Sequence, residues 1–495
     1  MSKSHPINHL CSIQFLVFAT LLFAFLVSAV NAADRPNIVF IMSDDHAKEG
    51  IASYGSWLAD SLHTPNIDRL AREGMRFNNV CCNNSICSPS RASILTGQFS
   101  HKNGVTGLGG AISPTSPWVS VELQRSGYET CIVGKYHLGA APLGFDDYYI
   151  TKGQGAWFDP KFYRPGMEYG KRAKSTPEQR EGYCSDIYTD IAIDWLDGRN
   201  RKKPFCLMLH FKAPHHSYEY PERWDHYLAD VTVPEPPSLH EDVERSSPLL
   251  KAPYWGHMIR NRAYFGRHVN DSHPPMPAND GTPRGQASAA YQHMIKKYIR
   301  CVAAVDDNVK RVLDYLDKNL LAENTIVMYT GDQGYWLGQH GFYDKRLILE
   351  GSLIMPLLVR YPAAIEAGGV EEHLCSNVDF APTMLDYAGV KIPAAMQGRS
   401  LRPLLNGESP EDWRDANYYC YWGGPPKHWG LRTDRYKLIC FPGTDEIEFY
   451  DLKEDPEELT NVAADPNYAK RILQCRIMLA AKMKQLDVKP LDLPQ

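Results

Sequence analysis

Cys87-Ser88-Pro89-Ser90-Arg91, followed by Ala92-Ser93-Ile94-Leu95-Thr96-Gly97, is the most informative stretch of the chain. Proline is favoured in the first turn of a helix, where its missing N–H would have no partner, so Pro89 predicts that a helix begins near Cys87. The first turn of a helix presents free N–H groups and the positive end of the helix dipole, which favour anionic chemistry. We therefore interpret Cys87 as a reactive residue.

The pattern Cys-x-Pro-Ser-Arg resembles the signature of type I sulfatases. In that family the cysteine is oxidised after translation to formylglycine, whose hydrated aldehyde is the nucleophile. The resemblance implies that Cys87 carries this modification and that a formylglycine-generating machinery is a partner of the chain. The alternative is a buried free cysteine at a helix start. That explains a lone cysteine more often than catalysis does, but it does not explain the whole eleven-residue run.

The length and charge of the chain limit its class. With 495 residues it can bury a large core, which predicts one large domain and a smaller one. Its formal net charge of -5 gives no case for nucleic acid or an anionic membrane surface as a partner. An anionic substrate stays open, because local cationic side chains decide whether one binds.

The N-terminal segment has the pattern of a secretory signal. Lys3 precedes an apolar run from Ile13 to Val30, and Val30-Asn31-Ala32 offers small residues for cleavage before Ala33. This predicts a signal peptide over residues 1–32 and export to the periplasm or the extracellular space. An uncleaved membrane anchor is the alternative, because the apolar run approaches the length of a spanning helix. We expect no stable membrane insertion of the mature chain.

Apolar segments that end in polar clusters predict buried strands. The strand segments are residues 36–42, 128–133, 205–211 and 325–330, and the helical patterns among them cover 66–73, 120–126, 186–197 and 289–320. This alternation predicts an α/β fold, with a parallel or mixed sheet covered by helices. Ligands of such sheets bind beyond the carboxyl ends of the strands, so we expect the four polar clusters to converge on one edge. The family resemblance implies an alkaline-phosphatase-like version of this fold.

The C-terminal part of the chain has a different pattern. Residues 416–422, 428–440 and 446–452 are short strand-like pieces, and a helix is predicted over 468–484. They predict a small four-stranded antiparallel sheet with the helix packed on it. We therefore divide the chain into a sulfatase catalytic domain over 33–405 and a subdomain over 406–495. The segment 231–284 is rich in Pro, Gly and polar residues and is predicted to be an insertion near the site.

Oxygen donors follow two of the predicted strands. Asp44 and Asp45 follow the first, and Asp332 and Gln333 follow the last. Four such donors at strand ends favour a hard cation, Ca²⁺ or Mg²⁺. Alone, acids in such places usually cap helices or solvate loops. Both pairs match positions that bind calcium in the sulfatase family, so the resemblance implies one Ca²⁺ per chain, with Cys87 as a further ligand.

Four more positions match family elements, and each would be weak evidence by itself. Lys135 and His137 lie in Gly-Lys-Tyr-His-Leu-Gly, His215 lies in Ala-Pro-His, and Lys345 lies in Asp-Lys-Arg. The resemblance implies that Lys135, Lys345 and His215 neutralise the sulfuryl oxygens, while Arg91 holds the formylglycine hydroxyls and the carboxylates. It implies that His137 removes a proton so that sulfate is eliminated. Whether His215 or Lys345 protonates the departing alcohol stays open.

Other stretches are similar to exported bacterial mucin-desulfating or N-acetylglucosamine-6-sulfatase-like enzymes. They are Gly144-Phe145-Asp146, Gly153-Gln154-Gly155, Val233-Pro234-Glu235-Pro236 and Arg432 to Leu438. The similarity implies a sulfated carbohydrate substrate, expected to be a 6-sulfated hexosamine or a related glycan. Gln339 and Ile354 stand where these relatives carry an acid and a basic residue, which leaves the sugar and the sulfate position open. The candidates for sugar contacts, with packing in the core as the alternative for each, are Trp157, Trp255, Trp422 and His428.

Three other functions fit parts of the pattern. An arylsulfatase would use the same residues on smaller esters. A phosphomonoester or phosphonate hydrolase would use the same scaffold, but a two-zinc phosphatase needs further His and Asp ligands, for which Gln333 is a poor substitute. A non-catalytic glycan-binding pseudoenzyme would keep the fold only, and the full set of catalytic residue types argues against it.

Overall fold

The computed structural model describes residues 35–170, 174–241, 247–251, 256–269, 276–424 and 426–494. The predicted signal peptide, residues 1–32, lies outside these ranges, and so does Trp255. A helix with the length and apolarity needed to span a bilayer does not occur in the described part of the chain.

A nine-stranded mixed sheet forms the centre of the molecule. Its strands are β1 (Asn37–Asp44), β2 (Met75–Cys81), β3 (Glu129–Lys135), β4 (Asp147–Thr151), β7 (Phe205–Pro214), β8 (Thr325–Gly331), β11 (Ile354–Arg360), β12 (Gly369–Glu371) and β13 (Cys375–Ser376). The spatial order is β12-β2-β11-β8-β1-β7-β3-β4, with β13 also paired to β2. Only β11 runs antiparallel to its neighbours in this sheet. All four predicted strands are present, as β1, β3, β7 and β8.

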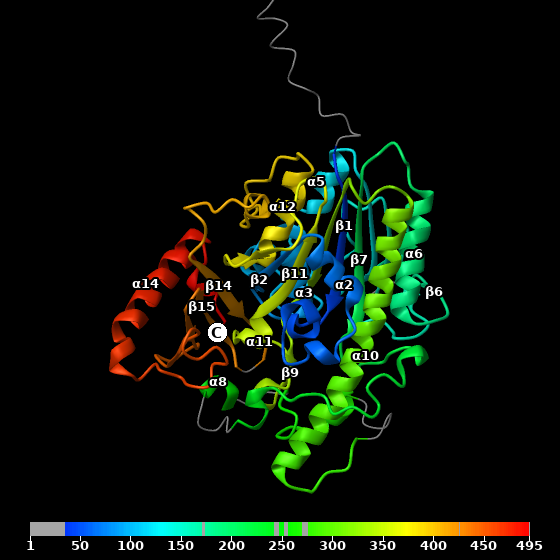
Figure 1. Cartoon of the computed structure of the whole chain (residues 1–495). Helices are drawn as coiled ribbons and strands as arrows, with labels where there is room; N and C mark the ends of the chain where they lie inside the picture. The colour runs from blue at the N-terminus through cyan, green and yellow to red at the C-terminus, as the bar shows by residue number, and fades with distance from the viewer. Residues whose placement is uncertain are drawn as a thin grey trace, which may run out of the picture.

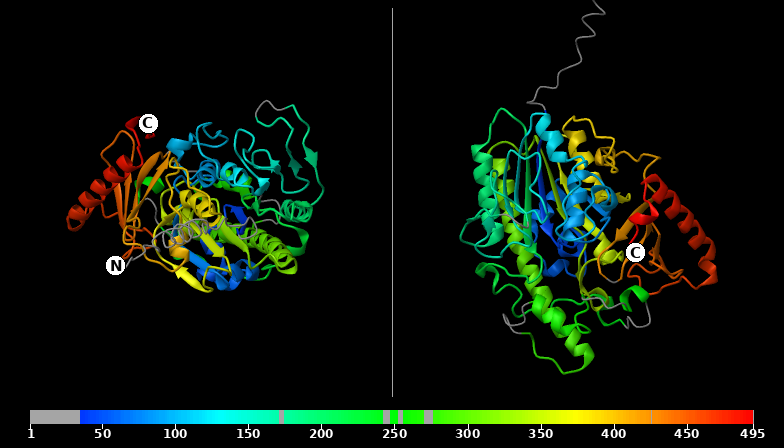
Figure 2. Two further views of the ribbon diagram at one scale, coloured as in Figure 1. Left: turned by 90° about the horizontal axis from the view of Figure 1, so that it is seen from above. Right: turned by 180° about the vertical axis from the view of Figure 1, so that it is seen from behind.

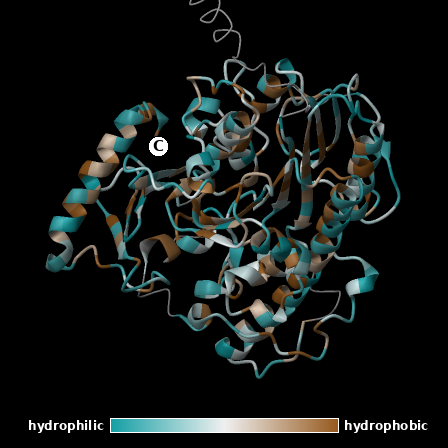
Figure 3. Ribbon diagram, turned by 45° about the horizontal axis from the view of Figure 1, so that its top comes forward, coloured by the Kyte–Doolittle hydropathy of each residue, from teal (hydrophilic) through white to brown (hydrophobic). Residues whose placement is uncertain are grey.

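Helices cover both faces of this sheet. One face packs against α2 (Pro65–Arg72), α6 (Cys184–Gly198) and α10 (Pro283–Lys318), and the other against α3 (Cys87–Thr96), α5 (Val119–Arg125) and α12 (Phe380–Tyr387) (Figure 1). Side chains alternate along a strand, so β1 serves both cores: Val39 and Ile41 point to the first, Phe40 and Met42 to the second. Hydrophobic residues accordingly gather on the central strands and the inner sides of the helices (Figure 3).

The long helix α10 begins earlier than predicted. We expected it to start near residue 289, but it starts at Pro283. The Thr282 side chain caps its first turn by accepting a hydrogen bond of 3.0 Å from the Gly285 N–H. A Thr-Pro pair at a helix start is a capping signal that outweighs the absence of apolar residues in the first turn.

The C-terminal region forms a separate antiparallel sheet, as predicted. Its strands are β14 (Ala416–Tyr421), β15 (His428–Thr433), β16 (Tyr436–Cys440) and β17 (Ile447–Asp451), paired in chain order, and α14 (Ala469–Gln485) packs on them. The strand-like piece 428–440 forms two of these four strands, which turn between Thr433 and Tyr436. This sheet and α14 lie to one side of the large sheet (Figure 2). The domain division at residue 405 stays a prediction.

The remaining helices and strands are short. They are α4 (Ser100–Asn103), α8 (Pro248–Lys251), α9 (Arg262–Val269), α11 (Glu350–Leu353), α13 (Arg402–Leu405), β5 (Lys161–Phe162), β6 (Glu178–Gln179), β9 (Trp336–Leu337) and β10 (Tyr343–Asp344). Strands β9 and β10 form an antiparallel hairpin that leads directly into Lys345. The hairpin is not part of the large sheet, but it places Lys345 at the edge of that sheet, against Asp45.

Candidate active site

The predicted polar clusters meet at one edge of the large sheet. Strands β8, β1, β7 and β3 are neighbours and run parallel, so their carboxyl ends lie side by side. Asp44 ends β1, Lys135 ends β3, His215 follows β7 and Asp332 follows β8. The polypeptide between β2 and α3 places Cys87 at the same edge. The expectation that the four clusters converge is correct.

Three buried carboxylates form the centre of the site. One oxygen each of Asp44, Asp45 and Asp332 lie within 4.8 Å of one another, and all three residues are 0% exposed. Burial raises the pKa of Asp332 to about 8, and the neighbouring charge of Asp44 acts in the same direction. Such close carboxylates repel each other unless a cation lies between them. The cluster therefore has a donor set that suits a metal ion.

Gln333 extends this oxygen cluster. Its Nε2 donates a 2.5 Å hydrogen bond to Asp45 Oδ1, which turns the amide towards the carboxylates. Its buried Oε1 has no hydrogen-bond donor among the residues described. A buried acceptor without a donor is uncommon and calls for a partner. A hard cation that binds carboxylate and amide oxygens fits this group, so the residues present suit Ca²⁺.

Three cationic side chains lie directly against the carboxylates. Arg91 Nη2 lies 3.0 Å from Asp44 Oδ1 and 3.0 Å from Asp332 Oδ2. Lys345 Nζ lies 2.6 Å from Asp45 Oδ2, and Lys135 Nζ donates to Asp44 Oδ2. Although burial opposes it, the Lys135 ammonium holds the pKa of Asp44 well below its usual range. Buried charges of both signs are thereby paired at short range, as such charges must be.

Cys87 begins α3 and is 1% exposed. Its Sγ lies 4.0 Å from Lys135 Nζ. The helix start was expected to favour an anion here, yet burial and the neighbouring Asp44 raise the pKa of this thiol well above its usual value. A protonated thiol is a poor nucleophile, so the unmodified side chain is badly suited to attack an ester.

Two histidines complete the predicted set. His137 follows Lys135, and burial together with the Lys135 charge lowers its pKa to about 2. Its Nδ1 has no hydrogen-bond partner within the described ranges. His215 Nε2 lies 3.6 Å from Asp45 Oδ2, and burial holds its pKa well below the usual value. Both imidazoles are therefore neutral near pH 7, with one ring nitrogen of each unprotonated.

Two residues of the site were not predicted. Gln154 Oε1 accepts a hydrogen bond from Lys135 Nζ, and its main-chain oxygen accepts one of 3.1 Å from Lys212 Nζ. Lys212 is 3% exposed, lies 4.7 Å from the centre of the Trp157 ring, and has a pKa that burial lowers to about 8. Gln154 lies in the quoted stretch Gly153-Gln154-Gly155, and Lys212 directly precedes the Ala-Pro-His element that contains His215. That adjacency was the only signal in the sequence.

The predicted sugar contacts are mostly packing residues. His428 is buried, and both its ring nitrogens are used, by the Ile348 N–H and by the Pro426 carbonyl. Trp422 donates its indole N–H to the Asp492 carbonyl and packs against the C-terminal core. Neither is placed to bind a sugar. Trp157 lies close to the site but under Lys212, where it stacks on Tyr183.

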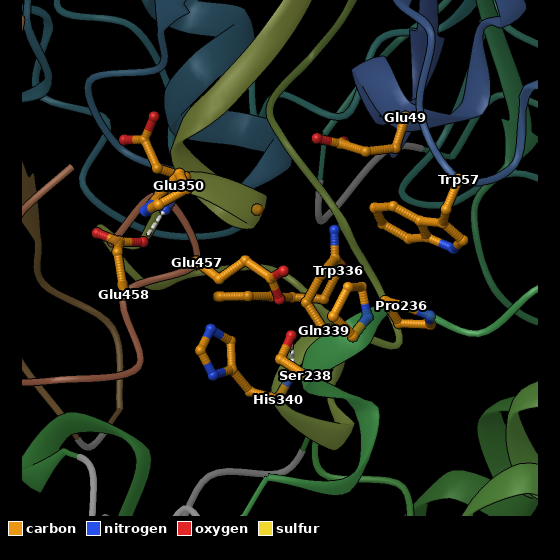
Figure 4. Close-up of a pocket in the computed structure, with 13 residues that line it drawn as sticks. Glu49, Trp57, Pro236, Ser238, Trp336, Gln339, His340, Glu350, Glu457 and Glu458 are labelled. Carbon is orange, nitrogen blue, oxygen red and sulfur yellow. Dashed lines mark hydrogen bonds between the residues drawn. The ribbon is translucent and has the colours of Figure 1, made fainter. Parts of the chain in front are cut away.

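A cavity of 150 Å³ elsewhere is acidic. Figure 4 shows that Glu49, Glu350, Glu457 and Glu458 surround it. None of the predicted catalytic or metal-binding residues lines it. Glu350 is neutralised by Arg432, but the excess of carboxylates makes the cavity unsuited to an anion. An anionic ester therefore does not fit this cavity. It fits the site at the carboxyl ends of β8, β1, β7 and β3, which we call the strand-end site and where two lysines and an arginine lie.

Family models match almost the whole of the described chain. A model of the sulfatase family matches residues 36–390. A model described as N-sulphoglucosamine sulphohydrolase, C-terminal, matches residues 338–488. An N-acetylglucosamine-6-O-sulfatase of Bacteroides thetaiotaomicron is 39% identical, over 91% of this chain and 87% of its own length. An N-acetylglucosamine-6-sulfatase of Homo sapiens is 28% identical, over 89% and 84%.

Solved structures also match this chain over most of its length. A protein in complex with its substrate D-glucosamine-2-N,6-O-disulfate matches with a TM-score of 0.83 and 36% identity, covering 92% of this chain and 99% of that one. A phosphonate monoester hydrolase from Silicibacter pomeroyi matches with a TM-score of 0.73 and 22% identity, covering 92% and 97%, which shows a shared fold. These matches confirm the predicted alkaline-phosphatase-like fold.

Proposed function

The chain belongs to the sulfatase family and hydrolyses sulfuric esters, and from this premise we propose that it removes a 6-O-sulfate from glucosamine units of a sulfated glycan. The reaction converts R–O–SO₃⁻ and water into R–OH and hydrogen sulfate. The placement of Cys87 carries the proposal, because its sulfur lies beside Lys135 and next to the carboxylate cluster. The names of the relatives support glucosamine 6-sulfate as the substrate class.

We propose that position 87 acts as formylglycine. The raised pKa of the Cys87 thiol disfavours a thiolate nucleophile, which a converted side chain would not need. The hydrated aldehyde would supply hydroxyl groups at the N-terminus of α3. Arg91, one turn later in α3, would orient them while it holds the two carboxylates. The Cys-x-Pro-Ser-Arg pattern supports recognition by the modifying machinery of this family.

We propose that Asp44, Asp45, Asp332 and Gln333 hold one calcium ion together with the side chain at position 87. The three buried carboxylates support this choice, and so does the Oε1 of Gln333, which has no hydrogen-bond donor among the described residues. The ion would neutralise part of the charge on the bound sulfate group. Lys135 and Lys345 would do the same from the protein side, as fixed cations in a site with little water.

Proton transfer falls to the neutral histidines and to Lys345. The Nδ1 of His137 has no hydrogen-bond partner among the described residues, which leaves it open to a proton from position 87. His215 and Lys345 lie on the Asp45 side. One of these two would protonate the departing alcohol. The site thus offers a proton acceptor and a proton donor, the two groups that general acid–base catalysis needs.

We further propose that residues 1–32 direct export to the periplasm or the extracellular space. The support is the sequence pattern of a signal peptide, together with a substrate class that occurs outside cells. The division into a catalytic domain over 33–405 and a subdomain over 406–495 belongs to the same proposal. Expression of the full chain, followed by N-terminal sequencing of the exported protein, tests both the cleavage and its position before Ala33.

The substrate proposal is tested by release of sulfate from defined saccharides. The panel contains glucosamine 6-sulfate, N-acetylglucosamine 6-sulfate, a uronic acid 2-sulfate, nitrophenyl sulfate and nitrophenyl phosphate, with Cys87→Ala as the inactive control. We expect activity on the 6-sulfated amino sugars. Activity only on the uronic acid sulfate or on nitrophenyl sulfate would refute the 6-sulfate preference. Activity only on the phosphate would refute the sulfatase mechanism proposed for these residues.

A further inference from the structure

A cavity of 270 Å³ lies beside His137 and has no role in the reaction proposed above. We call it the His137 pocket. Its walls include Leu108, Gly109, His137, Lys152, Gly153 and Tyr169. They come from three stretches that are distant in sequence: the loop after α4, the loop after β3, and the chain that follows β4.

Two walls of the pocket are fixed to the start of α3. Ser88, the residue after Cys87, donates a 2.6 Å hydrogen bond to the His137 carbonyl and accepts one of 3.0 Å from the Gly109 N–H. Ser88 is 0% exposed. The pocket is therefore held at a fixed position relative to the nucleophile. A group bound in it would contact the wall that carries His137.

The third wall is fixed to the site through Gln154. Lys152 and Gly153 line the pocket, and the next residue, Gln154, accepts the hydrogen bond from Lys135 Nζ. The same residue is held from behind by Lys212 through its main-chain oxygen. The loop is thus anchored on its inner side, while its outer side forms the wall of the pocket.

The walls offer the kinds of contact that a sugar ring uses. Gly109 and Gly153 have positive φ angles of 69° and 58°, and a Cβ on either would meet no atom within 4 Å. The space beside these two glycines is therefore open to a ligand, although the Gly109 N–H itself already donates to Ser88 Oγ. Leu108 is 52% exposed, and Tyr169 is half-buried, so both offer apolar surface. The volume lies near the lower end of the range for ligand pockets, roughly 300 Å³, which suits one ring.

Lys152 gives the pocket a positive charge. Its side chain is exposed, and no carboxylate in the described part of the chain pairs with it. Its Nζ lies 6.0 Å from the centre of the Tyr163 ring, at the limit of a cation–π contact. The ammonium is therefore available to an acidic group that enters the pocket.

We propose that the His137 pocket binds the sugar unit attached to the one that carries the scissile sulfate, and that Lys152 pairs with a carboxylate or sulfate on that unit. The inference rests on the proposed function. The enzyme then recognises two sugar units, the sulfated unit at the strand-end site and an acidic neighbouring unit in the His137 pocket.

The test compares four substrates: glucosamine 6-sulfate alone, and the same unit linked to a uronic acid, to a sulfated hexose or to an unsubstituted hexose. Lys152→Gln is expected to lower kcat/KM about threefold to fivefold for one or both acidic disaccharides and to leave the other substrates unchanged. The acidic disaccharide that responds identifies the group that Lys152 contacts. Lys161→Gln, an exposed lysine on β5 outside the pocket, is the matched control.

A second variant tests the pocket without relying on charge. Leu108→Trp is expected to fill the pocket and lower kcat/KM about tenfold for all three disaccharides, with glucosamine 6-sulfate unchanged. Leu143→Trp, at a side chain that is 50% exposed, is its control. Equal losses on all four substrates, or no loss on any, would overturn the subsite while leaving the proposed function in place. Failure of the unmodified enzyme to release sulfate from any of the four contradicts the proposed function and the subsite with it.

Discussion

Lys135 Nζ lies 4.0 Å from Cys87 Sγ and at the same time donates hydrogen bonds to Asp44 and Gln154. One ammonium group therefore contacts the nucleophile position, the carboxylate cluster and the loop that borders the His137 pocket. It is 0% exposed, so its charge acts with little screening by water.

Replacement of this ammonium should remove most of the activity. Lys135→Met is expected to lower kcat/KM for glucosamine 6-sulfate about 100-fold to 1,000-fold, because a preorganised cation beside the reacting group is lost. Lys202→Met, at an exposed lysine far along the chain, is the control. Steady-state sulfate release measures both. A loss of less than about fivefold would show that Lys135 does not stabilise the transition state.

Gln154 should position Lys135 and not contact the substrate sulfate. Gln154→Ala removes one hydrogen-bond acceptor of a charged donor, so kcat is expected to fall about tenfold. Gln154→Glu should be worse, since a carboxylate would draw the ammonium away and offset its charge. Separate determination of kcat and KM, with Lys212→Met as a companion variant, checks this. Unchanged kcat in Gln154→Ala would contradict the positioning role.

Arg91 is expected to be essential for stability as well as activity. It is buried between Asp44 and Asp332, and Arg91→Met would leave both carboxylates without that counter-charge. Loss of one member of a buried ion pair typically costs about 3–5 kcal/mol. Lys310→Met breaks an exposed pair and should cost under about 0.5 kcal/mol. Denaturant unfolding compares the two, and similar small losses would contradict the account.

Calcium should stabilise the fold. The three carboxylates come together as ligands only in the folded chain, so chelation is expected to lower Tm and readdition of Ca²⁺ to restore it. At a concentration 100 times Kd the gain is about 2.7 kcal/mol. Asp332→Asn should shrink this shift, while Glu366→Gln, at an exposed acid, should not. Calorimetry that shows the same Tm with and without calcium would contradict the metal site.

Patterns of polarity were sufficient for the sheet and for the place of the site. Apolar runs that lead into Asp44, Lys135, His215 and Asp332 are typical of buried strands, and parallel strands bring such ends together. The order of residues along the chain determines both the strands and the edge at which their polar ends meet. The strands and the place of the site can therefore be predicted without contacts between distant segments.

Features set by packing between distant segments could not be predicted. Gln154 meets Lys135 and Lys212 only because a loop after β4 folds back over the sheet edge. The burial of His428 in the core depends on a hydrogen bond from Ile348 and on stacking with Tyr419, and Ile348 is distant in sequence. The pKa of Cys87 depends on burial and on Asp44, which outweigh the local effect of the helix start.

Mass spectrometry of the peptide that contains Cys87, taken from enzyme active on glucosamine 6-sulfate, tests the central claim most directly. The account predicts that position 87 carries an aldehyde in place of the thiol, that this peptide reacts with a hydrazide, and that the modified fraction tracks the specific activity. A fully active preparation in which Cys87 is an unmodified thiol would contradict it.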